Sequence, residues 1–209
     1  MKKFTLLIIL MLGLILSFAC APKKTDHFLP AESAVAVAGF SQPIHRWQMI
    51  NNHVVIGAKR FDPDIFKMLD SDLGALLSGN NYHIVAPSIV QQCVSVTPHG
   101  TDPGDAFHYW VSVARCVPAD FILVPFVFEW QERVGGDWGV DEPARVTIEL
   151  NLIDLSELRL SHFKFDERQQ SLTENLLGAG RFFQRGGKWI SARALAREGL
   201  EQGVRELGL

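Results

Sequence analysis

The chain has 209 residues, of which 47% are hydrophobic and 21% charged, and its formal net charge is −3 at pH 7. This length is enough for one sizeable hydrophobic core. The slightly acidic balance argues against a nucleic-acid-binding protein, because such a protein needs a basic face.

A short basic start leads into an apolar run that ends at a cysteine. Lys2 and Lys3 precede the run from Thr5 to Phe18, and Cys20 follows one small residue later. The run is shorter than the roughly 20 residues of a membrane-spanning helix, and it has the pattern of a secretory signal peptide. It resembles the leader of bacterial lipoprotein precursors, in which the cysteine is lipidated. The alternatives are a secreted protein without lipid and an uncleaved anchor.

The lipoprotein resemblance divides the chain into three parts. It implies a signal peptide over residues 1–19, lipidation of Cys20 with a tether over 20–32, and a single periplasmic α/β domain over 33–209. By the same resemblance, Ala21 after the cysteine implies the outer membrane, with the domain facing the periplasm. Loss of the leader takes the net charge from −3 to −5, because the leader carries two lysines and no acid.

The first half of the domain alternates between strand and helix patterns. Residues 33–40 form a small, β-branched apolar run that predicts a buried strand. Residues 43–60 are hard to assign. Asp62 before a proline then predicts the start of a helix with apolar residues on one face through Leu77, and residues 82–87 predict a short strand.

Two further helices and a long strand follow. We expect helices over residues 88–96 and 105–117, separated by a break at 97–104 that is rich in glycine and proline. Residues 119–131 predict a long strand. Pro125 within it favours an edge position or a bulge, because proline cannot donate to a strand ladder.

The last part predicts a meander and a final helix. Residues 134–143 form a glycine-rich hairpin tip, and residues 144–152 alternate between apolar and polar with period two, which predicts a half-buried antiparallel strand. A third strand is expected over 158–165, a helix over about 169–177, and a last helix from Ser191. The order β-α-β-α-β-β-β-α predicts an α/β fold with a mixed sheet, a C-terminal antiparallel meander and helices packed on it.

Four stretches resemble a recurring periplasmic module, the one in the N-terminal domain of TolB, the curli secretion lipoprotein CsgG and the penicillin-binding-protein activator LpoB. They are "AVAVAGF" at 34–40, "ADFILV" at 119–124, "ARVTIELNLIDL" at 144–155 and "LRLSHFKFDE" at 158–167. The resemblance implies a protein that binds another envelope protein and supports envelope assembly, secretion or transport. The hairpin tip is too short to cross a membrane as in the pore-forming relative.

The sequence has no recognisable catalytic motif, so we expect no enzymatic activity and no cofactor. One cluster offers an alternative function as a metal- or small-ligand-binding lipoprotein. His99, Asp102, Asp105 and His108 are residue types that bind zinc or another divalent ion. The same residues also suit a solvated loop followed by a helix start.

Two cysteines remain after Cys20. The periplasm oxidises thiols, which favours a disulfide between Cys93 and Cys116. The alternative is two buried free thiols.

Aromatic and basic residues cluster in two late loops, and Trp and Arg are common anchors of protein interfaces. The alternative is that most of these rings belong to the core. The candidate partner-binding residues are Trp130, Arg133, Trp138, Phe182, Phe183, Arg185 and Trp189.

Overall fold

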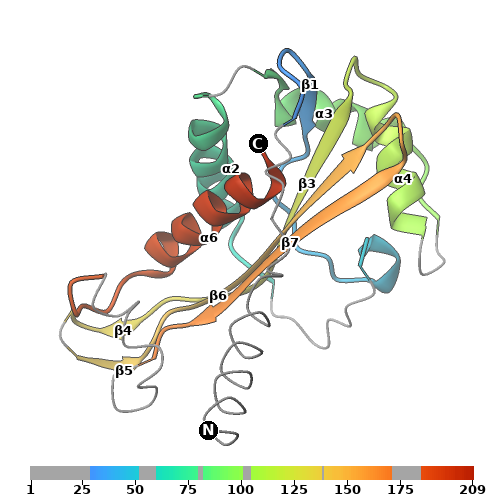
Figure 1. Ribbon diagram of the computed structural model, residues 1–209. Helices are drawn as coiled ribbons and strands as arrows, with labels where there is room; N and C mark the ends of the chain where they lie inside the picture. Colours follow the sequence, from blue (N-terminus) through green and yellow to red (C-terminus); the bar gives the residue numbers. More distant parts are fainter. Residues whose placement is uncertain (1–28, 52–59, 80–81, 101–104, 138, 171–184) are drawn as a thin grey trace, which may run out of the picture.

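A computed structural model describes residues 29–51, 60–79, 82–100, 105–137, 139–170 and 185–209 (Figure 1). The strands are β1 Ala34–Val37, β2 His83–Val85, β3 Phe121–Gln131, β4 Val134–Gly135, β5 Val140–Glu142, β6 Arg145–Asp154 and β7 Arg159–Arg168. The helices are the short 3-10 helix η1 Arg46–Gln48 and the α-helices α2 Pro63–Leu77, α3 Pro87–Val96, α4 Asp105–Ala114 and α6 Ala192–Leu207.

The main sheet has five strands in the order β2-β1-β3-β6-β7. Strand β1 pairs in parallel with β2 and β3, while β3, β6 and β7 form an antiparallel meander. Strands β4 and β5 form a separate two-stranded extension of the hairpin between β3 and β6. The predicted mixed α/β fold with its C-terminal meander is therefore confirmed.

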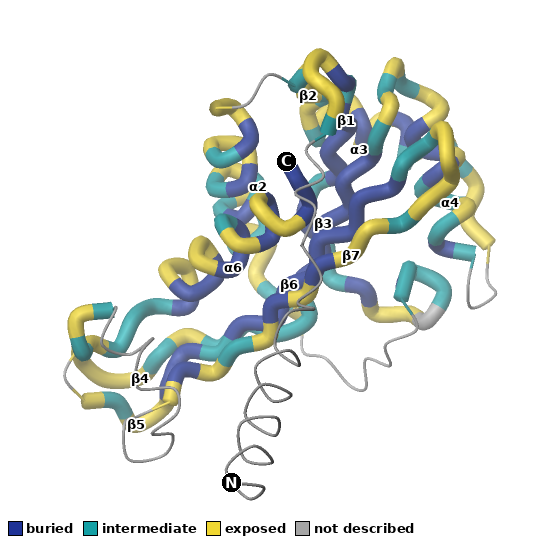
Figure 2. Tube along the Cα trace, in the orientation of Figure 1, coloured by how far each residue is buried: buried dark blue, intermediate teal, exposed yellow. Residues whose placement is uncertain are grey.

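Helices cover both faces of the sheet, as Figure 1 shows. Side chains of a strand point alternately to opposite faces, and the buried residues divide in the same way. Leu123 of β3 belongs to the cluster that contains Leu69 of α2 and Leu200 of α6, whereas its neighbour Ile122 belongs to the cluster with Val111 of α4. Helices α2 and α6 therefore pack on one face, and α3 and α4 on the other. Figure 2 shows the buried strands between them.

Local sequence signals explain where most helices begin and end. The Asp62 side chain accepts a hydrogen bond from the Asp64 N–H at the start of α2, and Ser191 caps α6 through the Ala194 N–H. Gly208 ends α6 in the left-handed conformation at φ 73°, which a glycine adopts without steric cost. Helix α3 differs from expectation, because it begins at Pro87 and its cap is Ala86, with no side-chain hydrogen bond.

Strand β3 lies in the middle of the sheet, so the edge position predicted from Pro125 is wrong. The Ala38 N–H donates to the Leu123 carbonyl, and the Val127 N–H donates to the Ser41 carbonyl. Pro125 lies between these two bonds, on the side of β3 where β1 has already ended, so little is lost by its missing N–H. The register shift comes later, between Val127 and Glu129.

Strand β6 is buried on both faces, so the prediction of a half-buried strand is wrong. Thr147, Glu149 and Asn151 on its polar face are 6%, 1% and 0% exposed. Asn151 receives a hydrogen bond from the Asn51 side chain at 2.7 Å and donates to the Val124 carbonyl, and the His162 ring lies 3.6 Å from the Glu149 carboxylate. Polar side chains that find partners can be buried, and alternation alone does not distinguish them from solvated ones.

Some predictions fall outside the described residues. They include most of the helix expected at 169–177 and part of the unassigned segment at 43–60. In the part of the chain that the structure describes, no helix combines the length and apolar character of a membrane span.

Candidate functional site

The two late loops meet at one end of the sheet. We call this region the hairpin end: the last residues of β3, the β4–β5 hairpin and residues 185–190. It lies at the lower left of Figure 1, where α6 begins.

A hydrogen-bond network joins the hairpin to the segment before α6. The Arg133 guanidinium donates to the Trp189 carbonyl and to the Asp137 carboxylate, the latter at 2.6 Å. The Trp189 N–H in turn donates to the Asp137 carbonyl at 2.8 Å. Residues more than 50 positions apart therefore form one continuous surface.

Two polar side chains hold this segment against the core. Gln169 is 1% exposed; it donates to the Lys188 carbonyl at 2.8 Å and accepts from the Ile190 N–H at 2.9 Å. Glu132, at the end of β3, accepts a hydrogen bond from the Ala192 N–H at the start of α6. The hairpin end is thereby attached to both the sheet and the helix.

Arg185 is part of the structure of this end rather than of its exposed surface. Its side chain is 8% exposed and forms ion pairs with Glu167 of β7 at 2.8 Å and with Glu198 of α6 at 2.5 Å. Burial alone would lower the pKa of Arg185, but the hydrogen bonds to Glu198 and Glu167 raise it. The residue is a buried cation that joins three parts of the chain.

The structure brings together only some of the predicted partner-binding residues. Arg133 and Trp189 touch, and Trp130 packs half-buried against the core. Sequence reasoning missed Val134, which is 51% exposed at the hairpin. Trp138, Phe182 and Phe183 lie outside the described residues, as does Cys20.

Cys93 of α3 and Cys116, just after α4, form a disulfide with an S–S distance of 2.09 Å. The bond ties together the two helices on one face of the sheet.

The candidate metal ligands are engaged with aromatic rings instead. His99 stacks on Trp47 with ring centroids 4.3 Å apart, and His108 lies edge-on to Phe107. Asp102 is outside the described residues, and among those described no group of three or more side chains is arranged to hold a metal ion.

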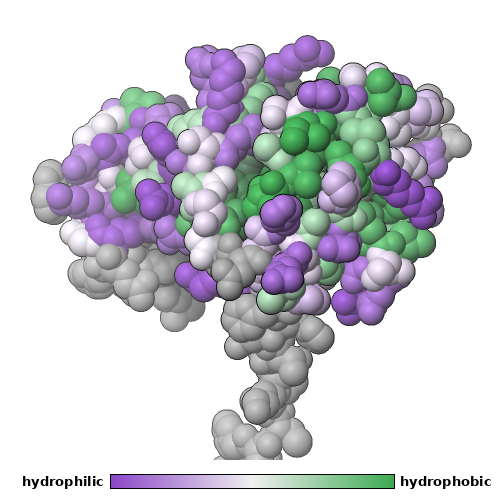
Figure 3. All heavy atoms as spheres, turned by 90° about the horizontal axis from the view of Figure 1, so that it is seen from above, coloured by the Kyte–Doolittle hydropathy of each residue, from purple (hydrophilic) through white to green (hydrophobic). Residues whose placement is uncertain are grey.

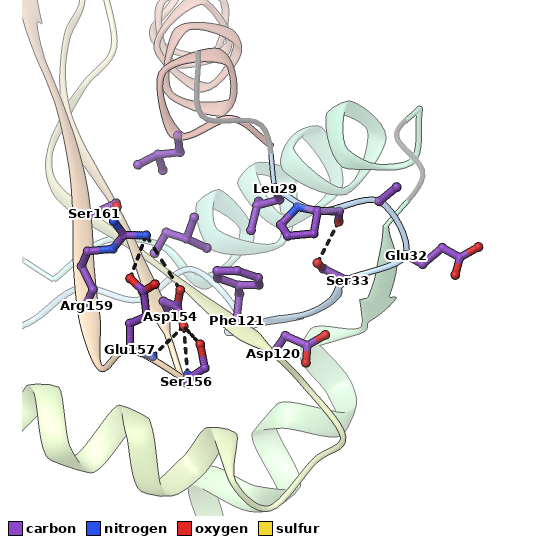
Figure 4. Close-up of a pocket in the computed structure, with 14 residues that line it drawn as sticks. Leu29, Glu32, Ser33, Asp120, Phe121, Asp154, Ser156, Glu157, Arg159 and Ser161 are labelled. Atoms are coloured by element: carbon purple, nitrogen blue, oxygen red, sulfur yellow. Dashed lines mark hydrogen bonds and ion pairs between the residues drawn. The ribbon is translucent and has the colours of Figure 1, made fainter. Parts of the chain in front are cut away.

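A first pocket of about 650 Å³ lies at the end of the sheet where β1 begins. Figure 3 looks onto this end of the molecule and shows apolar residues in the middle of the face with hydrophilic ones around them. Figure 4 shows Phe121 inside the pocket and Asp154, Glu157 and Arg159 on one side of it.

The carboxylates of this first pocket have structural roles. Asp154 accepts from the N–H groups of Ser156 and Glu157 in the β6–β7 turn. Burial alone would raise the pKa of Asp154, but these hydrogen bonds, with that of the Ser156 hydroxyl and the charge of Arg159, lower it. Asp120 accepts from the Ala34 N–H at 2.9 Å.

A second pocket, of about 600 Å³, lies where β1 ends. We call it the aromatic pocket, because its walls include Trp47, Tyr109, Trp110 and Phe126, together with His99.

No protein-family model matches the chain, and no curated protein is similar to it in sequence. Three solved structures illustrate what the fold is similar to. The PelC dodecamer from Paraburkholderia phytofirmans has a TM-score of 0.48 at 14% identity, over 88% of this chain and 94% of that one. Lipoprotein GNA1162 from Neisseria meningitidis has a TM-score of 0.42 at 13% identity, over 74% and 94%. The C-terminal domain of LpoB from Salmonella enterica has a TM-score of 0.40 at 11% identity, over 69% and 88%. Similarities at this level do not place the chain in a family.

Proposed function

We propose that this chain is a non-catalytic lipoprotein of the bacterial envelope, anchored in the outer membrane through Cys20, whose periplasmic domain binds another envelope protein through the hairpin end. The observation that carries the proposal is the network of Arg133, Asp137 and Trp189, which unites two loops into one surface. A surface held in place before binding loses less conformational entropy when a partner docks.

The position of the tether suits this role. The Leu29 N–H donates to the Gly208 carbonyl at the C-terminal end of α6, while the hairpin end is attached to the N-terminal end of the same helix through Glu132. Helix α6 has 16 residues, which corresponds to about 24 Å. An anchored domain would therefore present the hairpin end away from its attachment point.

The chemistry of the surface also fits a protein partner. Trp189 is half-buried, Val134 is exposed, and Trp138 follows Asp137 in the sequence. Tryptophan and arginine at the centre of a desolvated patch supply much of the energy of protein interfaces. The lipid would add effective concentration by confining both proteins to one membrane.

The disulfide supports the location, because stable disulfides form in oxidising compartments such as the periplasm. Labelling with radioactive palmitate tests the anchor directly. We expect the native chain to incorporate label and the Cys20→Ser variant to incorporate none. Label that persists in Cys20→Ser would refute the anchoring site.

Photo-crosslinking in living cells tests the binding surface. A photoreactive residue at position 134 or 138 is expected to capture a specific envelope protein. The matched control is position 96, since Val96 is 74% exposed but lies on α3, away from the hairpin end. Equal capture from position 96, or capture of lipid alone from 134 and 138, would leave the proposed surface without a partner. Loss of co-purification in a folded Trp138→Ala variant would support it further.

A further inference from the structure

The aromatic pocket occupies a position that α/β folds commonly use for ligands. From β1 the chain runs through α2, on one face, to β2, and it returns through α3 and α4, on the other face, to β3. The two connections separate at the carboxyl end of β1, and the residues that follow it, from Ala38 to Pro43, line the pocket. A crevice outside the carboxyl ends of parallel strands, where the connections diverge, is a general ligand position in open α/β sheets. Its volume of about 600 Å³ also suits a small molecule.

Aromatic rings from several elements form its walls. Trp47 of η1 stacks on His99, and Tyr109 meets Trp110 of α4 edge to face at 5.3 Å. Phe126 of β3 is 2% exposed and forms part of the pocket lining. Electron-rich ring faces of Trp and Tyr attract cations within about 6 Å, so the walls suit an ammonium group better than an anion.

Asp70 supplies the charge of the pocket. It is the one carboxylate among the lining residues that the structure describes, and these include no lysine or arginine. The Phe40 N–H donates to its Oδ1 at 2.7 Å, which fixes the direction of the carboxylate. Burial raises the pKa of Asp70, and the Phe40 hydrogen bond opposes that rise.

Gly39 allows the carboxylate to sit at the pocket. A Cβ atom at position 39 would lie 3.3 Å from Asp70 Oδ2 and 3.7 Å from the Pro87 side chain. The absence of a side chain therefore leaves Oδ2 close to the backbone after β1. A half-buried acid without a basic partner in the lining is costly for the fold, so a gain in binding would explain its presence.

We infer that the aromatic pocket binds a small organic cation, an ammonium group carried on apolar carbon, with Asp70 opposite the charge and the rings of Trp47, Tyr109 and Trp110 around it. This site is separate from the hairpin end, and the inference does not depend on the partner proposed above.

The test uses two probes that differ only in charge, choline and 3,3-dimethylbutan-1-ol, in which carbon replaces the nitrogen. Binding to the full chain is measured by ligand-observed NMR in a detergent that has no choline head group. We expect choline to bind about tenfold more tightly than the neutral alcohol. Equal affinities, or no saturable binding of either probe, would overturn the inference.

Two substitutions assign the effect to the pocket. Asp70→Asn keeps an oxygen acceptor for the Phe40 N–H but removes the charge, so it should cost choline about tenfold in affinity and leave the alcohol nearly unchanged. Trp47→Leu keeps the wall apolar and should cost choline about fivefold.

The matched control is Asp64→Asn, which removes an exposed acid from the first turn of the same helix. It should change neither affinity. Because all three variants are checked by circular dichroism, a loss of fold is distinguished from a loss of binding. A preference for choline that survives in folded Asp70→Asn would contradict the role of Asp70. Failure here with successful crosslinking from position 134 would reject the pocket alone.

Discussion

Two glycines allow α6 to lie directly on the sheet. A Cβ atom at Gly203 would be 2.6 Å from both Leu150 Cδ1 and Phe163 Cδ1, and one at Gly199 would be 2.6 Å from Phe165 Cγ. The neighbouring groups are buried core side chains, which have little room to move aside. Their positions are therefore set by packing and not by turn geometry.

We predict that Gly203→Ala destabilises the protein by about 1–3 kcal/mol through overpacking. This is the reverse of the usual effect, since alanine is favoured over glycine within a helix by about 1 kcal/mol. Gly74→Ala is the control, because a Cβ atom there would meet no atom within 4 Å; it should stabilise by about 0.5–1 kcal/mol. Urea unfolding measures both, and a shift of the same sign in the two variants would contradict the packing argument.

Asp70 makes stability depend on pH. Its pKa in the folded state is raised above 3.8 by burial, so the folded state binds a proton more readily than the unfolded state. The free energy of unfolding therefore falls as pH rises through the window from about 3.8 to the raised value. At neutral pH the full cost of the buried charge is present.

We predict that Asp70→Asn is at least as stable as the native protein at pH 7 and loses that advantage below pH ~4, where the native acid is protonated. Thermal unfolding across this range, with Asp64→Asn as the exposed control, checks the sign. An Asp70→Asn variant that is less stable at pH 7 than at pH ~4, relative to the native chain, would show that the carboxylate stabilises the fold.

At the scale of elements, one buried arginine connects the segment before α6 to its neighbours. Arg185 joins Glu167 of β7 and Glu198 of α6. Loss of one partner from a buried ion pair costs about 3–5 kcal/mol, but Glu198 is 44% exposed and solvent screens its share.

We therefore predict that Arg185→Ala destabilises the chain by about 2–3 kcal/mol. Arg197→Ala removes an exposed partner of Glu201 on the same helix and should cost less than about 0.5 kcal/mol. Both values come from urea unfolding. Similar small costs for the two would indicate that Arg185 does not hold the hairpin end in place.

The disulfide links α3 to the end of α4 across a sequence separation of 23 residues. In the chain-entropy model, closing a loop of this size stabilises the fold by about 3 kcal/mol. The double variant Cys93→Ser, Cys116→Ser should lose about that amount in urea unfolding. Reductant should affect the native protein and leave the double variant unchanged; an equal effect on both would point to another cause.

At the scale of the whole molecule, the described domain begins at Leu29, eight residues after Ala21. Extended chain covers about 3.3–3.6 Å per residue, so a lipid on Cys20 would hold the domain within about 30 Å of the membrane. This short tether limits which partners the hairpin end can reach.

We predict that deletion of residues 21–26 reduces crosslinking from position 134, because the domain is drawn against the membrane. Replacement of the same residues by glycine and serine should preserve it, since reach depends on length and not on sequence. The yield of crosslinked partner on gels measures the effect. A deletion variant that crosslinks as efficiently as the native chain would show that the tether does not set the reach.

Local patterns predicted much of the fold. The apolar run after Ser33, the Asp62-Pro63 helix start and the alternation over 144–152 each correspond to an observed element, because their signals depend on neighbours in the sequence. Two errors had one origin. Pro125 in a central strand and the buried polar face of β6 depend on what other segments place beside them, which periodicity does not report.

The candidate sites were predicted less fully. The sequence suggested that the loops around Trp138 and Trp189 act together, but the bond from Arg133 to Trp189 became visible only in the fold. The aromatic pocket was not anticipated, because its residues come from positions between 38 and 126 and form no local motif. Trp47 and Trp110 were expected in the core, whereas both line the pocket.

The sequence by itself determined the mixed α/β fold and its meander, because hydrophobic period, helix caps and turn residues act over a few positions. Only the tertiary structure decided that Arg185 is buried in an ion pair, that Glu149 lies under the sheet's cover, and that Asp70 faces a ring of aromatic side chains. These properties arise from contacts between distant segments, and the environment of a charge depends on every element packed around it.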